Sequence, residues 1–148
     1  NGLGMEGFLQ NAIDKAKSGI SVIDSSAGVD RLLAVHDEDH GHDHDQGDFN
    51  PHLFTSPLMA AQLTDTIARE LARIDSANAA LYTENGRQYA EKLRALGHAM
   101  KAGLEHIANT RVIEPHGAFD YLARDIGLEI VAAMQPDGAS LSPSEMLA

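Results

Sequence analysis

Residues 111–134, RVIEPHGAFDYLARDIGLEIVAAM, decide the fold of this chain. The β-branched start at 111–113 and the apolar stretch at 128–134 predict two short strands. Between them, 118–125 predicts a helix that ends at Gly127. A strand, a helix and a second strand in this order are typical of a parallel sheet, so we expect an α/β protein.

Amphipathic helices are predicted before this unit, over 5–17, 57–74 and 77–108, because apolar residues recur there at steps of three and four. Ser56 is a favourable cap for the second helix, and Pro57 suits its first turn. The third helix would be about 50 Å long at 1.5 Å per residue, which exceeds the width of a small domain. Three glycines inside it, each weakening a helix by about 1 kcal/mol relative to Ala, would allow a bend.

These elements predict a helix-rich α/β fragment of a protein with two lobes. Residues 1–74 would be part of the N-terminal lobe, 75–109 a long rigid linking helix, and 110–148 the start of the C-terminal α/β lobe. Within the first lobe, apolar and β-branched residues at 20–24 and 29–35 favour short strands. The abrupt start and end of the sequence indicate an internal piece of a longer protein.

The composition excludes several function classes. The chain has 148 residues, no Cys and a formal net charge of −11. An acidic surface repels phosphate groups, so we expect neither a nucleic-acid partner nor a polybasic membrane contact. Without Cys, a metal site must use His, Asp or Glu. The sequence lacks Gly-x-Ser-x-Gly, a Gly-rich phosphate loop and His-Glu-x-x-His, so we do not expect an enzyme.

The segment 36–48 has no apolar residue and is rich in histidine and acid. Such a segment cannot pack against a core, so we expect an exposed loop. Imidazoles are the commonest protein ligands for zinc, copper and nickel, and the histidines are concentrated here. We interpret the segment as an accessory metal-binding loop, the alternative being a solvated acidic linker with incidental histidines. The candidate ligands in it are His36, His40, His42 and His44.

Two other histidines stand in more apolar surroundings. His52 follows Pro51, which restricts the backbone, and precedes the capped helix. His116 follows a predicted strand, where open α/β sheets bind their ligands. Each is a candidate metal ligand, and a polar loop histidine bonded to a carbonyl is the alternative for both. Glu114 and Asp120 flank His116 and are candidates to orient its ring.

Five segments, taken in order, resemble the metal-specific (zinc/manganese) substrate-binding proteins of bacterial ABC transporters. The family patterns NGLGLE, DPHxWLSP, DPxNAxxYxxN and FHDAFxYF correspond to residues 1–6, 50–57, 75–85 and 114–122, and the His- and Asp-rich loop of the zinc members corresponds to 36–48. Asn50 replaces Asp, Phe54 replaces Trp, and Gly117 is one of several changed neighbours of His116. These departures affect the surroundings of the ligands more than the ligands themselves.

The resemblance implies a function and a site. His52 and His116 would each bind the metal, with the remaining ligands outside this chain. A histidine at 116, where manganese members have Glu, favours zinc over manganese because nitrogen is the softer donor. The protein would capture a divalent metal ion in the periplasm, or otherwise outside the cytoplasm, either free or lipid-anchored. It would deliver the metal to the membrane subunit of an ABC permease.

Two further expectations accompany this interpretation. A piece cut from between two lobes exposes apolar surface, so self-association of the chain would not be surprising. The alternative function is a His-rich metal buffer or chaperone without a transporter, in which the helices serve only as scaffold. Deletion of 36–48 distinguishes the two, because only the buffer would lose its tight metal binding.

Overall fold

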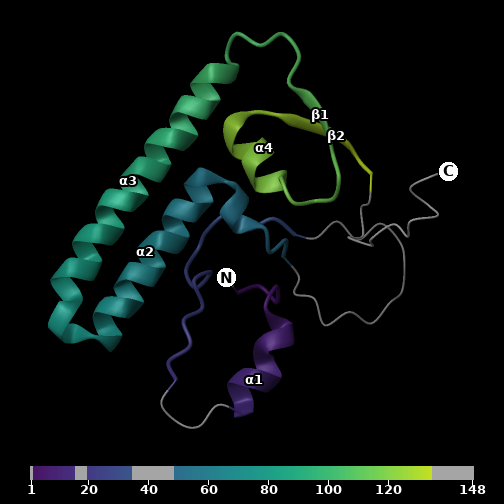
Figure 1. Cartoon of the computed structure of the whole chain (residues 1–148). Helices are drawn as coiled ribbons and strands as arrows, with labels where there is room; N and C mark the ends of the chain where they lie inside the picture. Colours follow the sequence, from purple (N-terminus) through teal and green to yellow (C-terminus); the bar gives the residue numbers. More distant parts are fainter. Residues whose placement is uncertain (1, 16–19, 35–48, 135–148) are drawn as a thin grey trace.

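The computed structural model describes residues 2–15, 20–34 and 49–134 (Figure 1). Three 3-10 turns precede helices, at Gly7–Leu9, Leu53–Thr55 and Ser76–Asn78. The helices are α1 (Gln10–Lys15), α2 (Pro57–Ile74), α3 (Ala79–Leu104) and α4 (Asp120–Ile126), and the strands are β1 (Arg111–Glu114) and β2 (Glu129–Ala133). In this described part of the chain, no helix combines the length and the apolar character that a bilayer crossing requires.

Helices α2 and α3 form an antiparallel hairpin and pack along each other (Figure 1). Helix α2 begins where the sequence predicts, because the Ser56 side chain accepts a hydrogen bond from the Met59 N–H and Pro57 occupies the first turn. Helix α3 has 26 residues and ends at Leu104, before the predicted end at 108. The long helix therefore exists, and it packs against α2 and α4.

Small residues of α3 make the contact with α2. Gly86, Ala90 and Gly97 are buried, and a Cβ on Gly86 would lie 2.3 Å from the Cβ of Ala68 on α2. Only glycine permits this approach of the two helices. Two of the three glycines expected to weaken α3, Gly86 and Gly97, thus lie in its helix–helix contact, whereas Gly103 is exposed. Three of the larger apolar residues along this helix are at least half exposed, namely Leu81, Tyr89 and Leu96.

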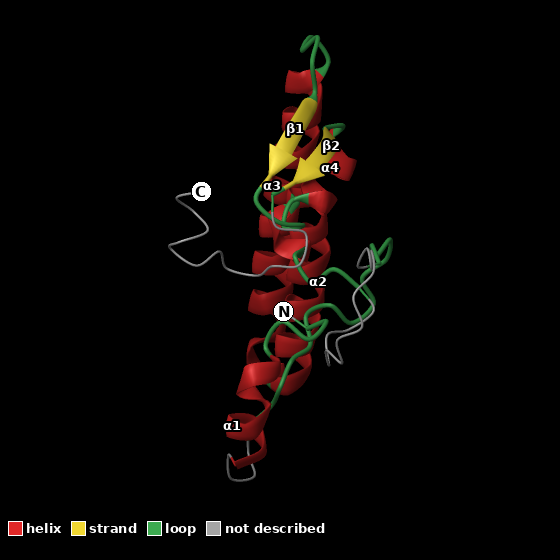
Figure 2. Ribbon diagram, turned by 90° about the vertical axis from the view of Figure 1, so that its right-hand side faces the viewer, coloured by secondary structure: helices red, strands yellow, loops and turns green. Residues whose placement is uncertain are grey.

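The segment that follows α3 folds as the sequence predicts. Strands β1 and β2 pair in parallel, with Arg111 opposite Glu129 and a register shift after Val112, and α4 connects them and packs against β2. Helix α4 ends at Gly127, whose φ of 91° is the left-handed conformation that glycine adopts at low cost. Figure 2 shows the two strands side by side, at the opposite end of the molecule from α1.

The hydrophobic core joins segments that precede the helical hairpin in the chain with one that follows it. Its buried members come from the loop before α2, from α2 itself, from α4 and from the segment 20–34. They are Val29, Leu53, Met59, Leu63 and Tyr121, with Leu3, Leu32 and Leu33 packed against them. The predicted division into 1–74, 75–109 and 110–148 remains a prediction, and in the described residues the flanking parts share this one core.

The expected strands near the N-terminus are wrong in the described residues. Residues 20–24 have no regular structure, and from Val29 to Ala34 the structure has one isolated antiparallel bridge, between Ala34 and Phe49. Gly28 and Arg31 have positive φ values of 81° and 57°, which interrupt an extended strand. The apolar residues here pack against the core, and an irregular segment can place them there as well as a strand can.

Candidate metal site

His52 is held at the entrance to α2 by the residues on either side of it. It precedes the 3-10 turn Leu53–Thr55, and the His52 carbonyl accepts hydrogen bonds from the N–H (3.2 Å) and the hydroxyl (2.8 Å) of Thr55. Leu53 is fully buried in the core, so it anchors the backbone beside the histidine. The His52 ring itself is half-buried.

His116 lies in the connection between β1 and α4. Its carbonyl accepts a hydrogen bond of 2.5 Å from the Ala118 N–H, which closes a tight turn. Ala118 and Tyr121 are buried on the helix side of this turn, and Glu114 is buried at the end of β1. The position after a strand and before a helix is the one predicted from the sequence.

The structure brings the two histidine rings together. The ring centroids of His52 and His116 lie 5.4 Å apart, and the ring planes are inclined at 70°. A zinc ion about 2.1 Å from an imidazole nitrogen would lie roughly 3.2 Å from the ring centroid, so two tetrahedral imidazole ligands would have centroids about 5.2 Å apart. The observed separation therefore suits two imidazoles that share one metal ion.

Electrostatics favour the neutral form of His52. Burial lowers the pKa of His52 below 6.5, and the nearby charge of His116 lowers it further, while the Asp120 carboxylate acts in the opposite direction. A neutral imidazole has a lone pair available for a metal, so a lowered pKa reduces competition from protons. The neutral form of His52 is therefore favoured near neutral pH, as cation binding would require.

Glu114 and Asp120 lie beside the histidines as the sequence predicts, but their hydrogen bonds go elsewhere. Glu114 Oε2 accepts from the Phe119 N–H at 3.0 Å, and Asp120 Oδ2 accepts from Asn50 Nδ2 at 2.8 Å. Burial raises the pKa of Glu114, and the neighbouring Asp120 carboxylate adds to this effect. Neither of these hydrogen bonds involves the ring of His116, so the predicted role of the two carboxylates in orienting it stays a prediction.

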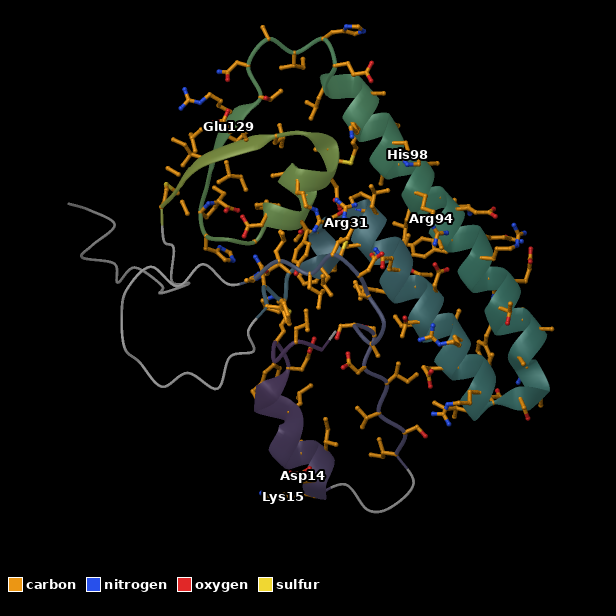
Figure 3. All side chains as sticks on the ribbon, turned by 180° about the vertical axis from the view of Figure 1, so that it is seen from behind. Asp14, Lys15, Arg31, Arg94, His98 and Glu129 are labelled. Carbon is orange, nitrogen blue, oxygen red and sulfur yellow. The ribbon has the colours of Figure 1, made fainter. Side chains whose placement is uncertain are left out.

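The remaining histidines contribute no further ligand within the described residues. His98 and His106 are exposed, and His98 lies along α3 (Figure 3). The accessory candidates His36, His40, His42 and His44 fall outside the residues that the structure describes. Among the residues it does describe, no group of three His, Asp or Glu side chains is arranged to hold a metal ion.

Two residues that the sequence interpretation did not assign to the site organise it. Asn50 bonds to both histidine-bearing loops, and the Tyr121 hydroxyl donates to the Asn50 carbonyl at 2.8 Å. A signal for Asn50 was present, because an Asn side chain often accepts from the N–H two residues later, as it does here from His52. Tyr121 offered no comparable local signal, since its partners are distant in the chain.

Comparison with known proteins assigns this chain to a class, the substrate-binding proteins of metal transporters. The zinc-binding lipoprotein AdcA of Streptococcus pneumoniae serotype 4 is 35% identical over 103 residues, which are 68% of this chain and 21% of AdcA. Two structures of the substrate-binding protein FpvC of Pseudomonas aeruginosa, with Mn²⁺ and with Ni²⁺, superpose with a TM-score of 0.76 at 40% and 39% identity. Each match covers 99% of this chain, which spans about half of FpvC.

The family model described as ZnuA, zinc-uptake complex component A, periplasmic, matches residues 1–148. The chain therefore belongs to the ZnuA family. Its members bind and transport a substrate and are not enzymes, as the sequence predicts. The predicted α/β fold class is confirmed by the structural matches together with the parallel β1–α4–β2 unit.

Proposed function

We propose that this protein captures a divalent metal ion outside the cytoplasm and delivers it to an ABC-type permease. The observation that carries the proposal is the pair of imidazoles, His52 and His116, whose centroids lie 5.4 Å apart. Membership of a family of periplasmic zinc-uptake components supports the same function. The chain spans only part of the length of these relatives, so the function is proposed for the whole protein.

Zinc is the proposed metal, and manganese is the less favoured one. Imidazole nitrogen is a softer donor than carboxylate oxygen and suits zinc, whereas manganese prefers oxygen-rich sites. The name of AdcA describes a zinc-binding protein, while FpvC was solved with Mn²⁺ and with Ni²⁺. The choice of zinc therefore rests on the donor atoms of this chain. Two imidazoles leave coordination positions for further ligands from outside the described residues.

The cellular setting follows from the family. A zinc-uptake component described as periplasmic, and relatives described as lipoproteins, favour a location outside the cytoplasm with or without a lipid anchor. The partner would be the membrane subunit of the permease. We further propose that the histidine-rich segment 36–48 collects metal for the site, because the described residues nearest to it in the chain, Ala34 and Phe49, form a bridge next to Asn50.

The proposal is tested by zinc titration of His52→Ala and His116→Ala against a chromogenic chelator. Each substitution removes one nitrogen donor, so we expect each to weaken zinc binding at least tenfold. His98→Ala is the matched control, since His98 is exposed on α3 and belongs to no cluster among the described residues. Unchanged affinity in both of the first two variants would refute the site.

A further inference from the structure

The Asn50 side chain uses its full hydrogen-bonding capacity between the two histidine-bearing loops. It is 6% exposed. Its Oδ1 accepts from the His52 N–H at 2.9 Å and lies 2.9 Å from His52 Nδ1. Its Nδ2 donates to the Gly117 carbonyl at 2.6 Å and to Asp120 Oδ2 at 2.8 Å. An amide can make four such bonds, and all four are made here.

These contacts determine which nitrogen of His52 carries the proton. A backbone N–H can only donate, so the Asn50 atom that faces the His52 N–H must be the carbonyl oxygen. That oxygen can only accept, so a neutral His52 must carry its proton on Nδ1. The lone pair is then on Nε2, and this nitrogen remains available to a metal ion.

The backbone of Asn50 is held as firmly as its side chain. Its N–H donates to the Leu33 carbonyl at 2.8 Å, and its carbonyl accepts from the Tyr121 hydroxyl at 2.8 Å. Tyr121 is fully buried, and its hydroxyl also accepts from the Leu33 N–H. The amide of Asn50 therefore projects from a fixed point of the core and cannot turn without breaking several bonds.

We propose that Asn50 is a positioning residue of the metal site: it selects Nε2 of His52 as the metal-binding nitrogen and sets the distance between His52 and His116. This inference rests on the proposed metal capture. One amide contacts both loops, at His52 and at Gly117 next to His116, although 67 residues separate Asn50 from Gly117. Groups that fix the orientation of a ligand contribute about 10–100-fold to metal affinity.

An aspartate at position 50 would keep the contacts with His52 and lose those with Gly117 and Asp120. Its carboxylate would still accept from His52 Nδ1–H, but it has no N–H for the Gly117 carbonyl or for Asp120. It would also place a second negative charge where Nδ2 now lies, 2.8 Å from Asp120 Oδ2. The neutral amide therefore suits the presence of Asp120. Substitution can separate the effect of Asn50 on the His52 tautomer from its contacts with Gly117 and Asp120.

The test uses Asn50→Ala and Asn50→Asp in the full chain, with two readouts. The first is the tautomer of His52 in the metal-free protein at pH 8, from two-bond ¹H–¹⁵N correlations of the ring. The second is zinc affinity, with zinc alone as the probe. We expect Asn50→Ala to lose the Nδ1-protonated preference and to bind zinc at least tenfold more weakly. We expect Asn50→Asp to keep the tautomer and still bind zinc at least tenfold more weakly.

Thr66→Val is the matched control for general loosening of the fold. Thr66 is 4% exposed and, like Asn50, bonds to a distant segment, at the Ala27 carbonyl. We expect it to change neither readout. A wild-type tautomer in Asn50→Ala, or wild-type or tighter zinc binding in Asn50→Asp, would overturn the inference. Because the tautomer is read without metal, it remains decisive for Asn50 even if His52→Ala and His116→Ala bind zinc normally and the proposed function fails.

Discussion

The imidazole of His52 meets that of His116 edge to face, with the ring centroids 5.4 Å apart. One ring comes from the loop before α2 and the other from the turn between β1 and α4. Their surroundings are joined by a single amide, that of Asn50, and by a shared core beneath them. Contacts within the chain therefore support this spacing, and such support would reduce the ordering cost of binding the proposed metal.

Stability of the metal-free protein should depend on pH through His52. Its pKa is lowered below 6.5 by burial and by the charge of His116, so the unfolded chain binds this proton more readily than the folded one. The stability that the neutral His52 contributes is fully present above pH 6.5. It is lost as the pH falls through the lowered pKa of His52 in the folded state. We expect the free energy of unfolding of wild type, relative to His52→Gln, to decrease over this interval. Urea titrations from pH 5 to pH 8 measure it, and a pH-independent difference would contradict the assignment.

Gly86→Ala should destabilise the helical hairpin. The new Cβ would lie 2.3 Å from the Cβ of Ala68, which a rigid backbone cannot easily relieve. Overpacking of this kind costs about 1–3 kcal/mol, against a gain of about 1 kcal/mol in helix propensity. Gly103→Ala is the control on the same helix, because a Cβ there meets nothing within 4 Å. We expect Gly103→Ala to be neutral or stabilising in chemical denaturation, and equal effects of the two substitutions would argue against the close contact.

Tyr121→Phe should cost about 1–3 kcal/mol of stability. The hydroxyl of Tyr121 accepts from the Leu33 N–H and donates to the Asn50 carbonyl, so its removal leaves both groups without this partner in the interior. Tyr82→Phe is the comparison, since the Tyr82 hydroxyl donates to Asp75 in a more exposed position. We expect a clearly smaller effect there. Thermal unfolding of the two variants in parallel measures this difference, and equal losses of stability would contradict the prediction.

Replacement of residues 36–48 by Asn-Gly should leave the high-affinity zinc site intact. Ala34 and Phe49 form an antiparallel bridge and the Asn50 N–H bonds to Leu33, so the two ends lie side by side and a short turn suits them. We expect the tightest zinc equivalent to persist, with loss of weaker equivalents bound by the removed histidines. Loss of the tight equivalent would favour the alternative function, a His-rich metal buffer.

Features that depend on neighbouring residues were predictable from the sequence. The start of α2 follows from Ser56 and Pro57, whose capping chemistry acts within one turn. The end of α4 at Gly127 and the parallel strands around it follow from equally local patterns. The immediate contexts of His52 and His116 made them candidates, the family resemblance implied that they bind metal, and this ligand role stays a prediction.

Features that depend on distant partners were not predictable in this way. The apolar residues at 29–34 indicated burial, but the same pattern serves an irregular segment as well as a strand. The glycines of α3 indicated weakness, because helix propensity is a local quantity, whereas Gly86 is needed for contact with Ala68. Each case required knowledge of what lies opposite the residue in space.

The sequence by itself determined the types of donor atom, the start of α2, the end of α4 and the order of the β1–α4–β2 unit, because these follow from side-chain chemistry and from interactions within a few residues. Only the tertiary structure decided that Asn50 reaches Gly117 and that the His52 and His116 rings approach each other. Distances between segments far apart in the chain are set by packing of a common core, here around Leu53 and Tyr121, and no local pattern encodes them.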